Sequence, residues 1–287
     1  MKFDCVIGNP PYQDDRIGES ATARPVYHLF MDAAYEIADA VLLITPARFL
    51  FDNGLTPREW NQKILADPRF KVLSYERDAS KYFPLAEIKG GVAITYRDRN
   101  KTFAPVKIFA PRREMTGILK KVWHSAPVAS MADLGYVATK FNTDALFADY
   151  PELKGRERRM SSNVFKYSFF RDEKATASDI MIYGVIRNKR HDKYIAKKYV
   201  DAADVNIGRY KIVMPKADGD GEFGAIVTNP EILPPGSGFT HTFLGVGSFD
   251  SLPEARACLK YLKTKFARAL LSVLKVTQNL NAEKLKY

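Results

Sequence analysis

Short apolar runs alternate with segments of helical spacing along residues 1–100. Four of the runs predict β-strands, at residues 3–8, 40–45, 70–75 and 91–96. Between the first two, apolar residues recur at helical spacing from Val26 to Ile37, and shorter helices are predicted at 47–51 and 57–65. We expect the first strand to be buried. The strand–helix–strand order is typical of a parallel sheet, so the first part of the chain is predicted to be an α/β domain.

The second half of the chain has a different pattern. Short apolar and aromatic segments are mixed with charged residues and interrupted by Gly/Pro clusters, which favours an α+β domain with irregular loops. Ser251 to Glu254 forms a capping-box sequence, and it predicts one long helix whose apolar residues, up to Leu274, share a face. We place the domain boundary between residues 108 and 109, which gives domains 1–108 and 109–287.

The first predicted strand ends abruptly in Asn9-Pro10-Pro11-Tyr12. Proline has a fixed φ and no N–H, so two successive prolines can neither extend a sheet nor continue a helix. The segment is therefore a stiff loop at the carboxyl end of a strand, which is the edge where open α/β sheets bind ligands. A plain turn would also explain the prolines, but a stiff loop after a strand suits a polar group that must be held in place.

Methylation of an amino group on a planar ring is the chemistry that fits this loop. Such an amine is a poor nucleophile because its lone pair is delocalised into the ring. Hydrogen bonds from its N–H groups to the Asn9 side-chain carbonyl and the Pro10 backbone carbonyl would localise that lone pair. The Tyr12 ring offers a face on which the base can stack, which is worth about 1–3 kcal/mol per base.

Three segments carry a resemblance to a known family: FDCVIGNPPY, YHLFMDAAYEIADAVLLITPARFL and YFPLAEIKGGVAITYRD. They resemble the adenine-specific DNA methyltransferases of restriction–modification systems, especially the large bifunctional type II enzymes. A weaker similarity near residues 245–278 resembles the end of the family's target-recognition region. The resemblance implies that Asn9, Pro10, Pro11 and Tyr12 are the catalytic motif and that Phe83 contacts a flipped adenine. Phe83 could equally be a core residue beside a turn.

The resemblance also implies S-adenosylmethionine as the methyl donor. The family holds this cofactor with a glycine-rich turn upstream of Asn-Pro-Pro-Tyr, and no such turn is found in this sequence. We therefore expect the carboxyl half of a Rossmann-like methyltransferase sheet joined to a mixed α+β target-recognition domain. The expected partner is the missing amino-terminal methyltransferase half, in the same or another polypeptide, and the fragment alone is expected to bind DNA without being active.

The charge is unevenly distributed. The chain has 44 Lys+Arg and 33 Asp+Glu, a net charge of +11, and residues 151–216 contribute +8 of it through 16 basic against 8 acidic residues. Such an excess favours a polyanionic partner, here double-stranded DNA, although a solvated surface is the alternative. The candidate DNA-binding residues are Arg187, Lys189, Arg190, Lys193, Lys197 and Lys198.

Other classes are less well supported. The sequence has two cysteines and four scattered histidines without metal-ligand spacing, so we expect reduced thiols, no metal site and a cytoplasmic location. The spacing of Glu87 and Lys89 is that of a metal-dependent nuclease core, but no suitable upstream acid accompanies it. Methylation of an RNA base or of a protein glutamine uses the same motif. A DNA-binding specificity module without catalysis is the non-enzyme alternative.

Overall fold

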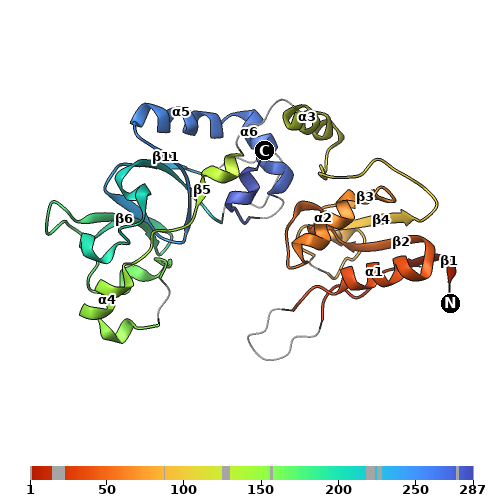
Figure 1. The fold of residues 1–287 in the computed structure, drawn as a ribbon, viewed down its shortest axis with the longest axis horizontal. Coiled ribbons are helices and arrows are strands. Elements are labelled where there is room, and N and C mark those ends of the chain that lie inside the picture. Colours follow the sequence, from red (N-terminus) through yellow and green to blue (C-terminus); the bar gives the residue numbers. More distant parts are fainter. Residues whose placement is uncertain are drawn as a thin grey trace. The chain divides into compact units, whose positions relative to one another are not determined.

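The computed structural model describes residues 2–14, 23–86, 88–124, 130–155, 158–217, 224, 228–275 and 278–286. The chain divides into two compact units, residues 1–121 and 122–287 (Figure 1). The predicted boundary after residue 108 falls within unit 1. Helix α3, Arg113–His124, spans the division itself. The described residues form a mixed α/β fold with three sheets, which confirms the coarse fold class but not its Rossmann-like detail.

Unit 1 is built on one four-stranded sheet in the order β1-β2-β4-β3. Its elements are β1 (Phe3–Gly8), α1 (Tyr27–Ile37), β2 (Ala38–Pro46), the 3-10 helix η1 (Ala47–Phe51), α2 (Arg58–Ala66), β3 (Phe70–Glu76), the 3-10 helix η2 (Ala79–Lys81) and β4 (Val92–Asp98). All the strands and helices predicted for this part of the chain are therefore present, within a few residues of their expected bounds.

The expectation of a parallel sheet is correct for one pair and wrong for the others. β1 and β2 are parallel, with Gly8 opposite Leu43, and α1 connects them. β4 lies between β2 and β3 and runs antiparallel to both. β1, β2 and β3 therefore run in one direction and β4 in the opposite direction. The reason lies in the connections: parallel neighbours need a crossover, whereas β3 reaches β4 through residues 77–91 without an α-helix.

The prediction that the first strand is buried is wrong. β1 is an edge strand, paired on one side alone, and its Phe3, Cys5 and Ile7 are exposed. Ile7 keeps 74% of its surface accessible. An apolar sequence predicts burial only where a second layer covers the strand, and among the described residues of unit 1 none does so here.

An aromatic core holds unit 1 together. Phe49 and Phe51 of η1 are fully buried, and their rings contact Trp60 and Tyr75 respectively at 5.5 and 5.4 Å between centroids. Edge-to-face pairs of this kind add about 0.5–1.5 kcal/mol each beyond the burial of apolar area. The core fixes η1, and with it the residues that directly follow β2.

Unit 2 contains two sheets, β10-β6-β7 and β5-β11-β8-β9. Its strands are β5 (Gly135–Tyr136), β6 (Ile180–Ile186), β7 (Lys189–Ile195), β8 (Tyr210–Pro215), β9 (Glu231–Leu233), β10 (Ser237–Phe239) and β11 (Phe243–Phe249). Its helices are α4 (Thr143–Asp149), α5 (Leu252–Leu262) and α6 (Lys265–Leu274), with short 3-10 helices between the elements. This arrangement matches the irregular α+β character that the sequence predicts.

The long helix predicted from Ser251 is two helices. The capping box of Ser251 and Glu254 is present and begins α5, as expected. The chain breaks at Lys263 and Thr264, where the Thr264 hydroxyl accepts a hydrogen bond from the Ala267 N–H and caps α6. A threonine that can cap a new helix competes with continuation of the old one, although the apolar spacing is compatible with either.

Candidate active site

The Asn-Pro-Pro-Tyr loop lies at the carboxyl edge of the unit 1 sheet. It follows β1 directly, and because β2 is parallel to β1, Pro46 at the end of β2 lies at the same edge. Pro46 is in turn paired with Val92 at the start of β4, and the Ala47 N–H donates to the Gly91 carbonyl at 3.0 Å. Three segments far apart in sequence, residues 9–14, 46–48 and 77–91, thus meet at one edge.

Backbone hydrogen bonds fasten the loop to the segment before α1. The Val26 N–H donates to the Tyr12 carbonyl at 3.2 Å, and the Asp14 N–H donates to the Arg24 carbonyl at 2.9 Å. The Asn9 side chain is exposed, and among the described residues it has no hydrogen-bond partner. Its amide is therefore available to a ligand, while the prolines and the paired backbone hold its position.

Tyr12 and Phe83, 71 positions apart in sequence, are brought into contact by the fold. Their ring centroids are 6.3 Å apart and the ring planes are perpendicular, at 85°. Phe83 is held by backbone hydrogen bonds, since its N–H donates to the Ala79 carbonyl and its carbonyl accepts from Ala86. A base stacked on either ring would present its edge or face to the other, which is favourable for aromatic groups.

The Tyr12 side chain offers its ring rather than its hydroxyl. The hydroxyl oxygen is buried and has no hydrogen-bond partner among the described residues. Burial raises the pKa of Tyr12 to about 12, so the group stays neutral at physiological pH. Proton transfer by this hydroxyl is therefore not part of the chemistry we assign to the site.

A pocket of about 420 Å³ opens beside Tyr12. This volume lies within the range of small-ligand sites, about 300–1,000 Å³. Its described lining includes two basic side chains and no Asp or Glu. The lining residues are Tyr12, Gln13, Ala23, Pro25, Tyr27, Pro46, Arg48, Gly54, Leu55, Ile88 and Lys89.

Sequence reasoning missed Arg48 and Tyr27, both of which line this pocket. Tyr27 begins α1, is buried, and has its pKa raised to about 12 by that burial. Arg48 follows Pro46 at the end of β2. Arg48 was predictable, because the carboxyl ends of neighbouring parallel strands meet at one edge of a sheet. The residues that follow the second strand are therefore site candidates in the same way as those that follow the first.

The nuclease alternative gains no support from the structure. Glu87 lies outside the described residues, and the Lys89 carbonyl accepts a hydrogen bond from the Arg48 Nε at 2.9 Å. Across the described ranges, no group of three or more His, Cys, Asp or Glu side chains could hold a metal ion. Within the same ranges, no helix is long and apolar enough to cross a membrane.

The six predicted DNA-binding residues lie on β7 of unit 2 or within a few residues of either end of it, and they fall into two groups. The paired trio forms ion pairs within the protein, through Arg190 with Glu231, Lys193 with Asp172, and Lys198 with Asp149. The unpaired trio makes no side-chain ion pair with any described residue; it consists of Arg187, Lys189 and Lys197.

Two members of the unpaired trio lie in or directly after the turn between β6 and β7. Arg187 and Asn188 both have positive φ, 47° and 62°, as the two central residues of a type I′ hairpin turn require. Arg187, in the turn, and Lys189, directly after it, are both exposed. The tip of the hairpin therefore presents two cations that form no ion pair with any described carboxylate.

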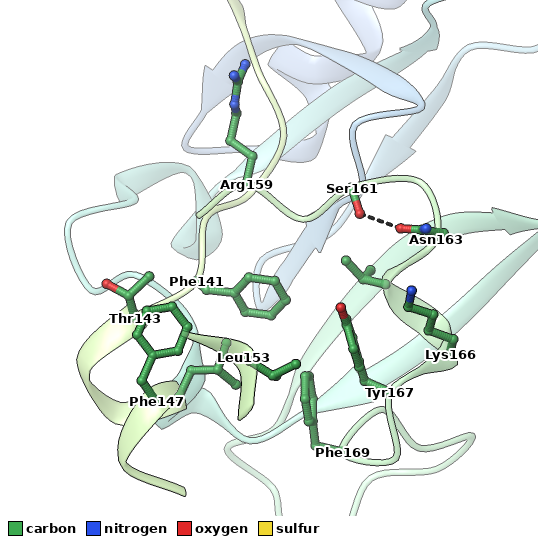
Figure 2. A pocket seen from close by; sticks show the side chains of 12 residues that line it. Phe141, Thr143, Phe147, Leu153, Arg159, Ser161, Asn163, Lys166, Tyr167 and Phe169 are labelled. Carbon is green, nitrogen blue, oxygen red and sulfur yellow. Dashed lines mark hydrogen bonds between the residues drawn. The ribbon is translucent and has the colours of Figure 1, made fainter. Parts of the chain in front are cut away.

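A second pocket, of about 180 Å³, lies in unit 2 (Figure 2). Aromatic side chains line it, and the Tyr167 and Phe169 rings are stacked at 5.4 Å and 13°. Ser161 donates a hydrogen bond to Asn163 at its rim. Most of its apolar lining belongs to the core cluster around Phe141, so the pocket is the open end of a packed core rather than a site with catalytic groups.

Comparison with known proteins supports the interpretation of unit 1 as part of a methylase. Residues 1–83 match the Eco57I restriction-modification methylase family. An "Uncharacterized adenine-specific methylase" of Mycoplasma pneumoniae (strain ATCC 29342 / M129 / Subtype 1) is 30% identical over 95 residues. These cover 32% of this chain and 22% of the relative, so the chain spans about a fifth of the length of the relative it matches. The predicted resemblance to adenine-specific methylases of restriction–modification systems is confirmed.

The family match covers the Asn-Pro-Pro-Tyr loop, η1 with Arg48, and Phe83 at its last position. It therefore includes the first two of the three segments that the fold gathers at the carboxyl edge of the sheet, and the third as far as Phe83. The roles of Asn9, Tyr12 and Phe83, and those of the basic residues in unit 2, stay predictions.

Proposed function

We propose that unit 1 supplies the base-binding side of a methyltransferase that modifies the exocyclic amino group of adenine in DNA. The observation that carries the proposal is the exposed amide of Asn9, which has no hydrogen-bond partner among the described residues and lies in the same loop as Tyr12 of the Tyr12–Phe83 ring pair. The loop and Phe83 lie in a segment that matches a restriction-modification methylase family.

In the proposed arrangement a flipped adenine stacks on Tyr12 with Phe83 beside it. The amino N–H groups of the base donate to the Asn9 Oδ1 and to the Pro10 carbonyl. Both acceptors strengthen their hydrogen bonds as positive charge develops on the amino nitrogen, so they stabilise the transition state more than the ground state. The rigid backbone of Pro10 and Pro11 keeps the acceptors in position before the base arrives.

The expected methyl donor is S-adenosylmethionine, which supplies an electrophilic methyl group on a sulfonium cation. The pocket beside Tyr12 does not fit a sulfonium cation, because its described lining contains the Arg48 guanidinium and no Asp or Glu. We assign no donor-binding residue to the described part of the chain. We propose that a further methyltransferase segment, in the same or another polypeptide, binds the methyl donor.

The open edge of β1 supports a partner segment of this kind. β1 has an unpaired edge and three exposed side chains of apolar character, and α1 adds the exposed Leu29 and Phe30. A long, apolar, unpaired edge is a template for pairing with another strand, and proteins normally cover such edges. A strand of the donor-binding half, added beside β1, would cover it.

Methyl transfer measured on a polypeptide that includes the donor half tests the role of Asn9. Asn9→Ala removes the acceptor and should lower turnover on the order of 100- to 1000-fold, the usual effect of losing one oriented group in a transition state. Gln62→Ala, which removes an exposed amide on α2 outside the lining of the pocket, is the control and should leave turnover near normal. Near-normal turnover in Asn9→Ala would show that the loop is a structural turn.

DNA is the proposed partner of unit 2, through the unpaired trio. Each phosphate contact lowers the slope of log K against log salt by about 0.9 for duplex DNA, so changing the three residues to Ala should make the slope less steep by about 2.7. The same change in the paired trio should alter the slope less, since each of its cations is already neutralised by a carboxylate. Equal effects of the two triple changes in a salt series of gel shifts would contradict this assignment.

A further inference from the structure

We propose that Arg48 is a preformed binding residue for a phosphate of the target nucleotide, in the pocket beside Tyr12. This inference rests on the proposed function and names a contact of the same site. Arg48 and Tyr12 line one pocket of about 420 Å³, so a ligand whose base reaches the Tyr12 ring can have its phosphate near the guanidinium.

The stem of Arg48 is enclosed by two glycines that have positive φ, Gly54 at 98° and Gly90 at 90°. A Cβ added to Gly90 would lie 3.0 Å from the Arg48 Cγ, and one added to Gly54 would lie 3.4 Å from the Arg48 Cβ. The glycine backbones therefore lie against the aliphatic part of Arg48, and a larger residue at position 90 would displace it.

One hydrogen bond fixes the orientation of the guanidinium. The Arg48 Nε donates to the Lys89 carbonyl at 2.9 Å. The two terminal nitrogens of Arg48 make no hydrogen bond or ion pair with any described residue. A guanidinium held at Nε and by its stem presents its terminal N–H groups as a fixed fork, the geometry that matches two oxygens of a phosphate.

The charge around Arg48 favours an anion. The described lining of the pocket contains the Arg48 guanidinium and no Asp or Glu. It also contains the aromatic side chains Tyr12 and Tyr27. A nucleotide has the matching features, a planar base and an oxyanion, and a site organised before binding loses less free energy to ordering.

Binding of two fluorescent probes, a nucleoside and its bisphosphate, to this chain tests the inference. The probes are 2-aminopurine deoxynucleoside and its 3′,5′-bisphosphate, whose fluorescence is quenched on stacking. The wild-type chain should bind the bisphosphate about tenfold more tightly, and Arg48→Gln should abolish this preference. Arg48→Lys should retain part of it, because it keeps the charge but lacks the fork. Arg24→Gln, the same change at an exposed arginine between two lining residues, is the matched control and should retain all of it.

Two variants separate this inference from the proposed function. Tyr12→Ala should weaken both probes by a similar factor, since it removes the stacking face; an unchanged affinity for the nucleoside would contradict the base site. A full phosphate preference in folded Arg48→Gln and Arg48→Lys would overturn the role of Arg48 while leaving the base site intact. A wild-type chain that binds both probes equally, or neither, also overturns it. Circular dichroism checks that each variant folds.

Discussion

Tyr12→Phe separates the two parts of the Tyr12 side chain. The ring contacts Phe83, whereas the hydroxyl is buried without a partner among the described residues. A buried polar group left without a hydrogen bond costs about 1–3 kcal/mol, so removing the hydroxyl should raise the free energy of unfolding by up to that amount. The stacking face is kept, so affinity for the 2-aminopurine nucleoside should stay within about twofold of the wild type.

The assay combines urea unfolding with fluorescence quenching on the same preparations. Tyr12→Ala is the contrast: it loses the hydroxyl and the ring together, so it should destabilise the chain and weaken base binding by about 1–3 kcal/mol, or roughly 5- to 150-fold. Loss of base affinity in Tyr12→Phe comparable to that in Tyr12→Ala would refute the reasoning, because it would mean that the hydroxyl itself binds the ligand.

Three further changes test the structure around the site and in unit 2. Lys211 is 1% exposed, and burial lowers its pKa to about 8. The folded state therefore loses this proton at a lower pH than the unfolded state does. As a result, the free energy of unfolding should rise by about 3 kcal/mol between pH 8 and 10.5. Lys211→Met should remove that increment in urea titrations. Ile7→Lys should reduce self-association of the chain in analytical ultracentrifugation, whereas Leu73→Lys, on the opposite edge strand, should not. Gly91→Ala should destabilise unit 1 by more than 2 kcal/mol, since its φ is +79° and its Cβ would lie 2.3 Å from a backbone carbonyl; Gly208→Ala, which meets no atom within 4 Å, is the control in thermal unfolding.

The elements of unit 1 were predictable because their signals are local. Pro46, Asn53 and Pro57 mark boundaries by their own backbone restrictions, and the helical spacing from Val26 reports α1 directly. The direction of β4 was not predictable from such signals. It depends on the pairing of β4 with both β2 and β3, and that is a property of the assembled sheet.

The Asn-Pro-Pro-Tyr loop could be singled out from four residues, whereas the basic region could not be resolved from its composition. Arg190 is paired with Glu231, 41 positions away, and no local pattern predicts that carboxylate. Counting charges along the chain therefore finds the region of these cations, but it predicts six DNA-binding residues where three form no ion pair with a described residue. The same limit applies to the contact of Tyr12 with Phe83: the resemblance implies that each residue contacts the base, and the fold shows that the two rings contact each other.

Charge and exposure distinguish two regions of unit 1 near the Asn-Pro-Pro-Tyr loop. The pocket beside Tyr12 contains the Arg48 guanidinium and no described Asp or Glu, which favours a nucleotide and disfavours a sulfonium cation. The second region is β1, which pairs with a described strand along one edge alone and has an Ile7 side chain that is 74% exposed. A methyl group must reach the amino nitrogen from a direction that the base and its phosphate do not occupy. Under the proposed function, the donor therefore approaches over β1, and the segment that binds the donor is the one that covers this edge.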